Sequence, residues 1–172
     1  MNYLRGKSCY LTGPITAVKD DGVGWRKSIT GSLQGFGIIV DDPTQTVVGG
    51  AGEIGQDKAR FKQLLAEGKI AEAKEAFFPV VRKDLRSVDK ADFLVLYYDP
   101  KIQMVGTIHE LVIAHLQRKP ILMFVEKANI KDMNPWILTF IKNGCIFTSW
   151  QDMMIYLKDV DDGKFNTSYW TL

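Results

Sequence analysis

The sequence contains few of the residues that build several common classes of protein. Only two of its 172 residues are cysteines, Cys9 and Cys145. That is too few for a disulfide scaffold and indicates a reducing compartment, although one disulfide between them stays open. The 22 basic and 20 acidic side chains leave a formal net charge of only +2. Such a balance gives no sign of a nucleic acid or an anionic membrane surface as a partner.

Long hydrophobic runs are also missing. The longest runs, Phe93–Tyr98 and Ile121–Val125, are far shorter than the ~20 residues of a membrane-spanning helix. Residues 1–7 are polar and lead directly into a strand pattern, without the apolar stretch of a signal peptide. We therefore expect a cytoplasmic protein that does not contact a membrane.

Histidine is nearly absent, and this argues against metal chemistry. His109 and His115 are the only two histidines, and their spacing places them on different faces of a helix. No Cys/His cluster and no G-x-S-x-G motif is present, so we expect neither a metal, a cofactor nor a serine nucleophile. Gly50–Gly55 fits the pattern G-x-G-x-x-G, but it does not follow the first strand. We interpret it as a loop or lid rather than a dinucleotide site.

The composition itself is that of an ordinary globular protein. Hydrophobic residues make up 46% and charged residues 24% of the chain, which excludes a disordered or fibrous protein. The length predicts one domain that spans residues 1–172.

Short apolar runs alternate with helical patterns along the chain. Strands are predicted at Ser8–Leu11, Ile38–Val40, Phe93–Tyr98, Ile121–Val125 and Cys145–Thr148. Helices are predicted over residues 22–37, 107–117, 135–143 and 150–158. Continuous apolar strands separated by helices predict an α/β fold with a parallel sheet covered on both faces. Five strands favour a flavodoxin-like, doubly wound order, 2-1-3-4-5, with a crevice at the carboxyl ends of strands one and three.

One segment, Asp42–Ala91, interrupts this alternation between strands two and three. Its later part has helical patterns over Gln56–Glu67 and Lys69–Phe78. We therefore predict a helical insertion beside the crevice.

Two carboxylates are the main candidates for chemistry. Glu110 follows Gly106 and Thr107 at the start of a predicted helix, where it is either the carboxylate of a capping box or a nucleophile at the crevice. Asp84 precedes strand three, where it is either an N-cap or a second site carboxylate that could handle a proton or contact a base.

Further candidates lie at the ends of the first three strands. Thr12, Gly13 and Pro14 close strand one, where the glycine would let a ligand approach the backbone or would simply form a turn. Trp25-Arg26 opens the next helix, and Arg26 would hold a phosphate or carboxylate unless it is a solvated helix residue.

Two aspartates, Asp42 and Asp99, end strands two and three. They are candidates for substrate contacts, Asp99 with a sugar hydroxyl, and each is also typical of a turn.

Several of these motifs occur together in a known order. They are Leu-Thr-Gly-Pro-Ile at 11–15, Gly-Trp-Arg at 24–26, Asp-Leu at 84–85, Ala-Asp-Phe-Leu-Val at 91–95 and Gly-Thr-Ile-His-Glu-Leu at 106–111. With this set the chain resembles the nucleoside 2-deoxyribosyltransferase family over roughly residues 7–150. That family has a flavodoxin-like fold and exchanges the base of a 2-deoxynucleoside, and some relatives hydrolyse nucleoside 5′-monophosphates.

The resemblance implies roles for individual residues. Glu110 matches the nucleophile that attacks C1′, Asp84 matches the aspartate that assists the leaving base, and Thr12–Pro14 matches the first nucleoside-binding loop. Met104 departs from the family, which often has a sugar-binding acid there, and Asp99 would compensate.

The resemblance also implies partners for the chain. They are a nucleoside or nucleotide, a free nucleobase, and a homo-oligomer in which a neighbour completes the site. Tyr169 and Trp170 in the tail are candidates to cover a base or to pack against the domain.

Two other functions stay open at this point. One is hydrolysis of the N-glycosidic bond of a nucleoside 5′-monophosphate. The other is a nucleotide-binding sensor without catalysis, because a fold alone does not define chemistry. An oxidoreductase built on Gly50–Gly55 is a distant third.

Overall fold

The computed structural model describes residues 2–45, 54–165 and 170. Its centre is a five-stranded sheet in the order β2-β1-β3-β4-β5. The strands are β1 (Ser8–Thr12), β2 (Ile39–Asp41), β3 (Phe93–Tyr97), β4 (Ile121–Phe124) and β5 (Ile146–Phe147). All four neighbouring pairs are parallel. The flavodoxin-like α/β fold predicted from the alternation of apolar runs and helices is thereby confirmed.

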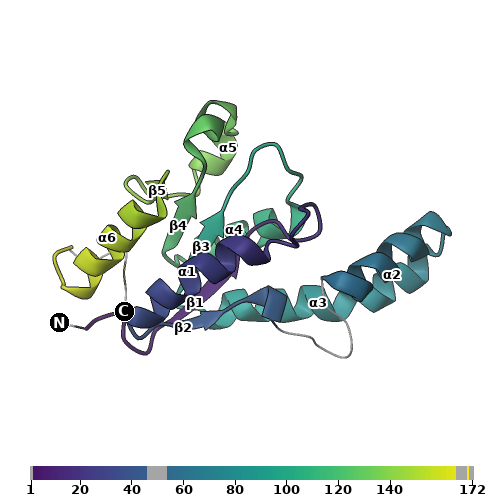
Figure 1. Ribbon diagram of the computed structural model, residues 1–172, viewed down its shortest axis with the longest axis horizontal. Helices are drawn as coiled ribbons and strands as arrows, with labels where there is room; N and C mark the ends of the chain where they lie inside the picture. Colours follow the sequence, from purple (N-terminus) through teal and green to yellow (C-terminus); the bar gives the residue numbers. More distant parts are fainter. Residues whose placement is uncertain (1, 46–53, 166–169, 171–172) are drawn as a thin grey trace.

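Helices cover both faces of the sheet, which explains why the central strands are apolar throughout. On one face α1 (Val23–Gly35) contacts α6 (Trp150–Asp161), and on the other α3 (Ile70–Lys90) contacts α4 (Val105–Leu116) (Figure 1). This arrangement follows from right-handed crossovers that run in opposite directions from β1. The core lies between the layers and is built around β1, β3 and β4. It places the carboxyl end of β1 beside the start of α4.

Two predicted elements near the far edge are shorter than expected. The strand predicted over residues 145–148 is reduced to β5, the edge strand, which pairs only with β4. The helix predicted over residues 135–143 ends at Leu138 as α5 (Pro135–Leu138). Beyond Leu138 the backbone bonds run to the third residue back, from Thr139 N to Trp136 O at 3.3 Å and from Phe140 N to Ile137 O at 3.2 Å, which is the pattern of a 3-10 turn rather than of an α-helix.

The insertion is helical, as predicted, but its second helix is much longer. After the 3-10 turn η1 (Pro43–Gln45) come α2 (Gly55–Ala66) and then α3, which passes through Pro79 and ends at Lys90. A proline usually ends a helix because it lacks an N–H group. Here packing against the sheet outweighs that loss, since Val80 and Val88 are buried. Figure 1 shows α2 and the first half of α3 extending away from the sheet.

Candidate active site

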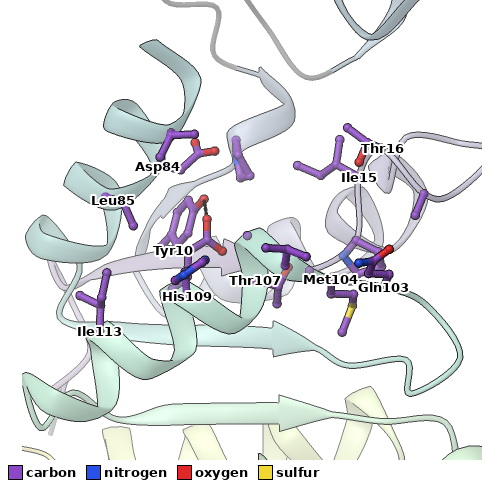
Figure 2. A pocket seen from close by; sticks show the side chains of 18 of the residues that line it. Tyr10, Ile15, Thr16, Asp84, Leu85, Gln103, Met104, Thr107, His109 and Ile113 are labelled. Atoms are coloured by element: carbon purple, nitrogen blue, oxygen red, sulfur yellow. Dashed lines mark hydrogen bonds between the residues drawn. The ribbon is translucent and has the colours of Figure 1, made fainter. Parts of the chain in front are cut away.

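A cavity of about 690 Å³ lies between α3, α4 and the loop that follows β1. Figure 2 shows Asp84 and Leu85 reaching it from α3, and Thr107, His109 and Ile113 reaching it from α4. The size is within the ~300–1,000 Å³ typical of small-molecule sites. The cavity therefore forms where the fold predicts a ligand, at the point where the winding of the sheet reverses.

Glu110 is the central carboxylate of this cavity. The side chain is buried, with 7% of its surface exposed. Tyr10 donates its hydroxyl to Glu110 Oε1 at 3.0 Å, and the Thr12 hydroxyl donates to Oε2. Figure 2 shows the bond from Tyr10 as a dashed line. Strand β1 thus holds both carboxylate oxygens in a fixed orientation.

The capping-box alternative for Glu110 is wrong. Helix α4 begins at Val105, with Met104 as its N-cap, three residues earlier than a Thr107 cap requires. Glu110 therefore lies in the second turn, beyond the position from which it could bond to the N-cap. Its carboxylate contacts the sheet instead. Thr107 is buried in the first turn, and both it and Gly106 line the cavity.

The surroundings of Glu110 make it hard to ionise. Burial is the main cause that raises the pKa of this carboxyl from 4.5 to about 7; the nearby charge of Asp84 acts in the same direction, and the hydroxyl of Thr12 acts against both. A carboxylate with a pKa near neutrality is typical of catalytic positions. The same group would be a reactive nucleophile once ionised, because little water surrounds it.

Asp84 also lies in this cavity, but not as the predicted N-cap. It is in the second half of α3, six residues before the helix ends, and only 6% of its surface is exposed. Lys83 Nζ lies 3.0 Å from Asp84 Oδ1 as an ion pair, although without the angles of a hydrogen bond. The structure therefore brings Asp84 and Glu110 to one cavity, with a buried carboxylate oxygen that has no hydrogen-bond donor among the described residues.

Arg26 lines the cavity, but its guanidinium is engaged by partners within the protein. Its side chain is fully buried, and its guanidinium donates to the carbonyls of Gly13, Pro14 and Gly22 at 3.0, 3.4 and 2.9 Å. Arg26 Nε also lies 3.6 Å from Asp42 Oδ1. Both residues were predicted to bind substrate, but these contacts are made within the protein. Arg26 holds the loop after β1 in shape, and Asp42 balances its charge.

Replacing Arg26 by alanine is expected to destabilise the fold by about 3–5 kcal/mol, because it leaves Asp42 and several carbonyl groups without their buried partner. Urea unfolding would measure this loss. Lys27→Ala, one residue along the same helix at an exposed position, is the matched control and should stay within about 0.5 kcal/mol of wild type. A loss no larger than that of the control would contradict the role given to Arg26.

At Gly13 the missing side chain leaves room for other atoms of the protein to approach the backbone closely. A Cβ at this position would lie 2.9 Å from Trp25 Cζ2 and 3.2 Å from Tyr97 O. Trp25 stacks in parallel on Trp150 at 5.7 Å and does not line the cavity. The structure therefore places Trp25 in an aromatic cluster with α6 and not among the residues that line the cavity. Gly13 and Pro14 do line the cavity.

Asp99 does not reach the cavity. Its Oδ1 accepts hydrogen bonds from Lys101 N at 3.0 Å and Asn129 Nδ2 at 3.4 Å. It is a turn residue after β3, so it cannot replace an acid at Met104, which itself lines the cavity and is nearly buried.

Sequence reasoning missed several residues that shape the cavity. Tyr10 lies in an apolar strand, where a single hydroxyl is easily taken for a core residue. Phe77 and Val81 line the cavity from α3, and with Asp84 they follow the helical spacing of four and three residues. A helix predicted to continue past Pro79 would have placed Phe77, Val81 and Asp84 on one face. His109 and Gln103 complete the wall.

Other predictions concern segments away from the cavity. Most of the Gly50–Gly55 pattern and Tyr169 lie outside the described residues. Trp170 packs on Phe93 with ring centroids 5.1 Å apart and donates Nε1–H to the Tyr156 hydroxyl at 2.9 Å. It therefore packs against its own domain.

The part of the chain that the structure describes has neither a metal-binding cluster nor a membrane-spanning helix. Within residues 2–45, 54–165 and 170, no three His, Cys, Asp or Glu side chains gather in a way that could hold a metal ion. No helix of these segments is both long and apolar enough to cross a bilayer.

Comparison with known proteins identifies the fold class and two similar solved structures. No protein-family model and no curated protein matches the chain. One similar structure is a 2-deoxyribosyltransferase from the psychrotolerant bacterium Bacillus psychrosaccharolyticus, with a TM-score of 0.59 and 18% identity over 86% of this chain and 90% of that one. Another is a conserved protein from Enterococcus faecalis V583, with a TM-score of 0.62 and 15% identity over 90% and 98% of the two chains. The chain is thus related to these proteins in fold.

Proposed function

We propose that the protein is a nucleoside 2-deoxyribosyltransferase. The observation that supports this best is Glu110, a buried carboxylate whose two oxygens are oriented by Tyr10 and Thr12 inside a cavity that also contains Asp84. A positioned carboxylate is the nucleophile that retaining glycosyl transfer requires. The similarity in fold to a 2-deoxyribosyltransferase agrees with this proposal.

The reaction would proceed in two displacements at C1′ of the sugar. In the first, a Glu110 oxygen forms a bond to C1′ as the bond from C1′ to the base nitrogen breaks, and the base leaves with a proton delivered through Asp84. In the second, the nitrogen of another base attacks C1′, the ester bond to Glu110 breaks, and the proton of the incoming base returns to Asp84. The hydroxyls of Tyr10 and Thr12 keep the carboxylate aimed at C1′ throughout. Two inversions give overall retention.

The lining of the cavity favours a neutral nucleoside over a nucleotide. Among the described residues that line it, Arg26 is the sole lysine or arginine. Its guanidinium already bonds to backbone carbonyls and pairs with Asp42. A phosphate in the cavity would meet the first turn of α4, whose residues Val105, Gly106 and Thr107 line it, but no lysine or arginine with donors to spare among the described lining residues. The hydrolysis of 5′-monophosphates is therefore the weaker alternative.

Incubation with paired substrates tests the proposal. We expect a 2′-deoxynucleoside and a free base to give the exchanged nucleoside, and the matching 5′-monophosphate to react at least tenfold more slowly, since none of the described residues that line the cavity offers a free cation to its phosphate. Chromatography of the products would show both results. Free deoxyribose without exchange would indicate a hydrolase, and faster turnover of the monophosphate would contradict a nucleoside substrate.

A further inference from the structure

A second cavity, of about 420 Å³, lies on the opposite side of α3 from the candidate active site, along the edge strand β2. It is a groove between the exposed face of the second half of α3 and Asp41 at the end of β2. In Figure 1 this part of α3 runs beside β2. We call it the α3 groove. Its cations are Arg82, Lys83, Arg86 and Lys90.

The α3 groove concentrates positive charge. Its four cations face one lining carboxylate, Asp41, so the local formal charge is +3, whereas the whole chain has a net charge of only +2. The rest of the molecule is therefore slightly negative. A groove in which positive charge predominates attracts a negatively charged ligand.

Three of these cations are available to a ligand. Lys83 is already engaged, since its Nζ donates to Pro43 O at 3.2 Å and pairs with Asp84. By contrast, Arg82, Arg86 and Lys90 are exposed and form no ion pair with a described residue. Phe78, at the mouth of the groove, lies under the Arg82 guanidinium, which is 5.6 Å from the ring centroid. That contact holds one guanidinium in place before any ligand arrives.

The spacing of two neighbouring cations suits the two ends of a triphosphate chain. Arg82, Arg86 and Lys90 are four residues apart on one helix, and the rise of about 6 Å from each to the next is close to the distance between the terminal phosphates of such a chain. Guanidinium groups bind phosphate oxygens in pairs and lose little freedom in doing so. We propose that the α3 groove binds an oligophosphate, such as the triphosphate chain of a nucleotide. This site is separate from the candidate active site, and its occupancy does not depend on Glu110.

Titration calorimetry with tripolyphosphate at low salt would test this site directly. We expect binding to the wild-type protein that weakens as salt is added. Removing one guanidinium should weaken it roughly tenfold, because a charge-assisted hydrogen bond is lost. The variants are Arg86→Gln and a triple variant of Arg82, Arg86 and Lys90 to glutamine. The control is Lys74→Gln, an exposed cation on the same helix outside the groove.

The outcomes separate this site from the active site. The Glu110→Ala variant should bind tripolyphosphate as the wild type does, whether or not the chain is a transferase. A nucleoside triphosphate that binds as tightly as tripolyphosphate, while the nucleoside alone leaves this binding unchanged, would place recognition in the phosphates. No binding of tripolyphosphate to the wild type, or equal binding by the folded triple variant, would overturn the proposal.

Discussion

Replacing Glu110 by alanine should lower the rate of base exchange on the order of 10⁴-fold or more, because the reaction loses the atom that bonds to C1′. The loss should appear in kcat, since the cavity wall that binds the substrate stays in place. Steady-state kinetics with a 2′-deoxynucleoside and an acceptor base would measure it.

Two further variants make this result interpretable. Glu110→Gln keeps the shape of the side chain but cannot act as a nucleophile, so it should be nearly as inactive as the alanine variant while still binding the nucleoside. Glu75→Ala, an exposed carboxylate on α3 away from the cavity, should keep wild-type kinetics. Full activity of Glu110→Ala would remove Glu110 from the mechanism. Tight nucleoside binding without turnover by the wild type would favour a sensor instead.

Replacing Glu110 by glutamine should also stabilise the folded protein at alkaline pH. Burial raises the pKa of Glu110 to about 7, from 4.5 for a free glutamate. Between these two values the folded protein holds a proton that the unfolded chain has released, so the free energy of unfolding falls as the pH rises. The shift corresponds to a cost of about 2–3 kcal/mol between pH 5 and pH 8. Glutamine stays neutral and escapes this cost.

Urea unfolding of the wild type and the Glu110→Gln variant at the two pH values would measure this effect. The difference between the proteins should change by about 2–3 kcal/mol in favour of the variant on going from pH 5 to pH 8. The same comparison with Glu75→Gln, where the carboxylate is exposed, corrects for the general effect of removing a charge. A difference between wild type and Glu110→Gln that does not change with pH would show that the folded protein ionises Glu110 normally.

The expected loss of activity and the expected pH dependence of stability have one cause, the burial of Glu110. The burial that would make Glu110 a reactive nucleophile is the same burial that makes its charge costly to the fold. Such an opposition between stability and activity is common at catalytic positions. Tyr10 and Thr12 reduce the cost by donating to the carboxylate, and in doing so they fix its direction.

The fold could be predicted from the sequence because the strands are continuous apolar runs. Burial on both faces leaves a simple pattern, and alternation with helices restricts the topology to few possibilities. The extent of α3 was not accessible, because Pro79 is a local signal for a helix end and only packing against the sheet overrides it. That one error also hid Phe77 and Val81, and it led to the prediction of Asp84 as an N-cap.

The candidate site was accessible only in part. The ordered motifs pointed to Glu110 and Asp84, and the structure brings both to one cavity. Trp25, Arg26, Asp42 and Asp99 were predicted from their places beside strand ends, where a substrate contact and an internal contact look alike in sequence. In the structure Trp25 stacks on Trp150, and Arg26 donates to backbone carbonyls. Asp42 pairs with Arg26, and Asp99 accepts from Asn129. These partners are either far away along the chain or backbone groups, which no sequence pattern marks. The α3 groove was hidden for a similar reason, since a balanced net charge does not show where the charges gather.

The central claim is that Glu110 forms a covalent bond to the sugar. Wild-type protein would be mixed with a 2′-deoxynucleoside without an acceptor base, quenched in acid, digested and analysed by peptide mass spectrometry. We predict a deoxyribosyl group on the peptide that contains Glu110, and its loss when an acceptor base is added before the quench. Base exchange at a normal rate with a deoxyribosyl group on another residue would contradict it.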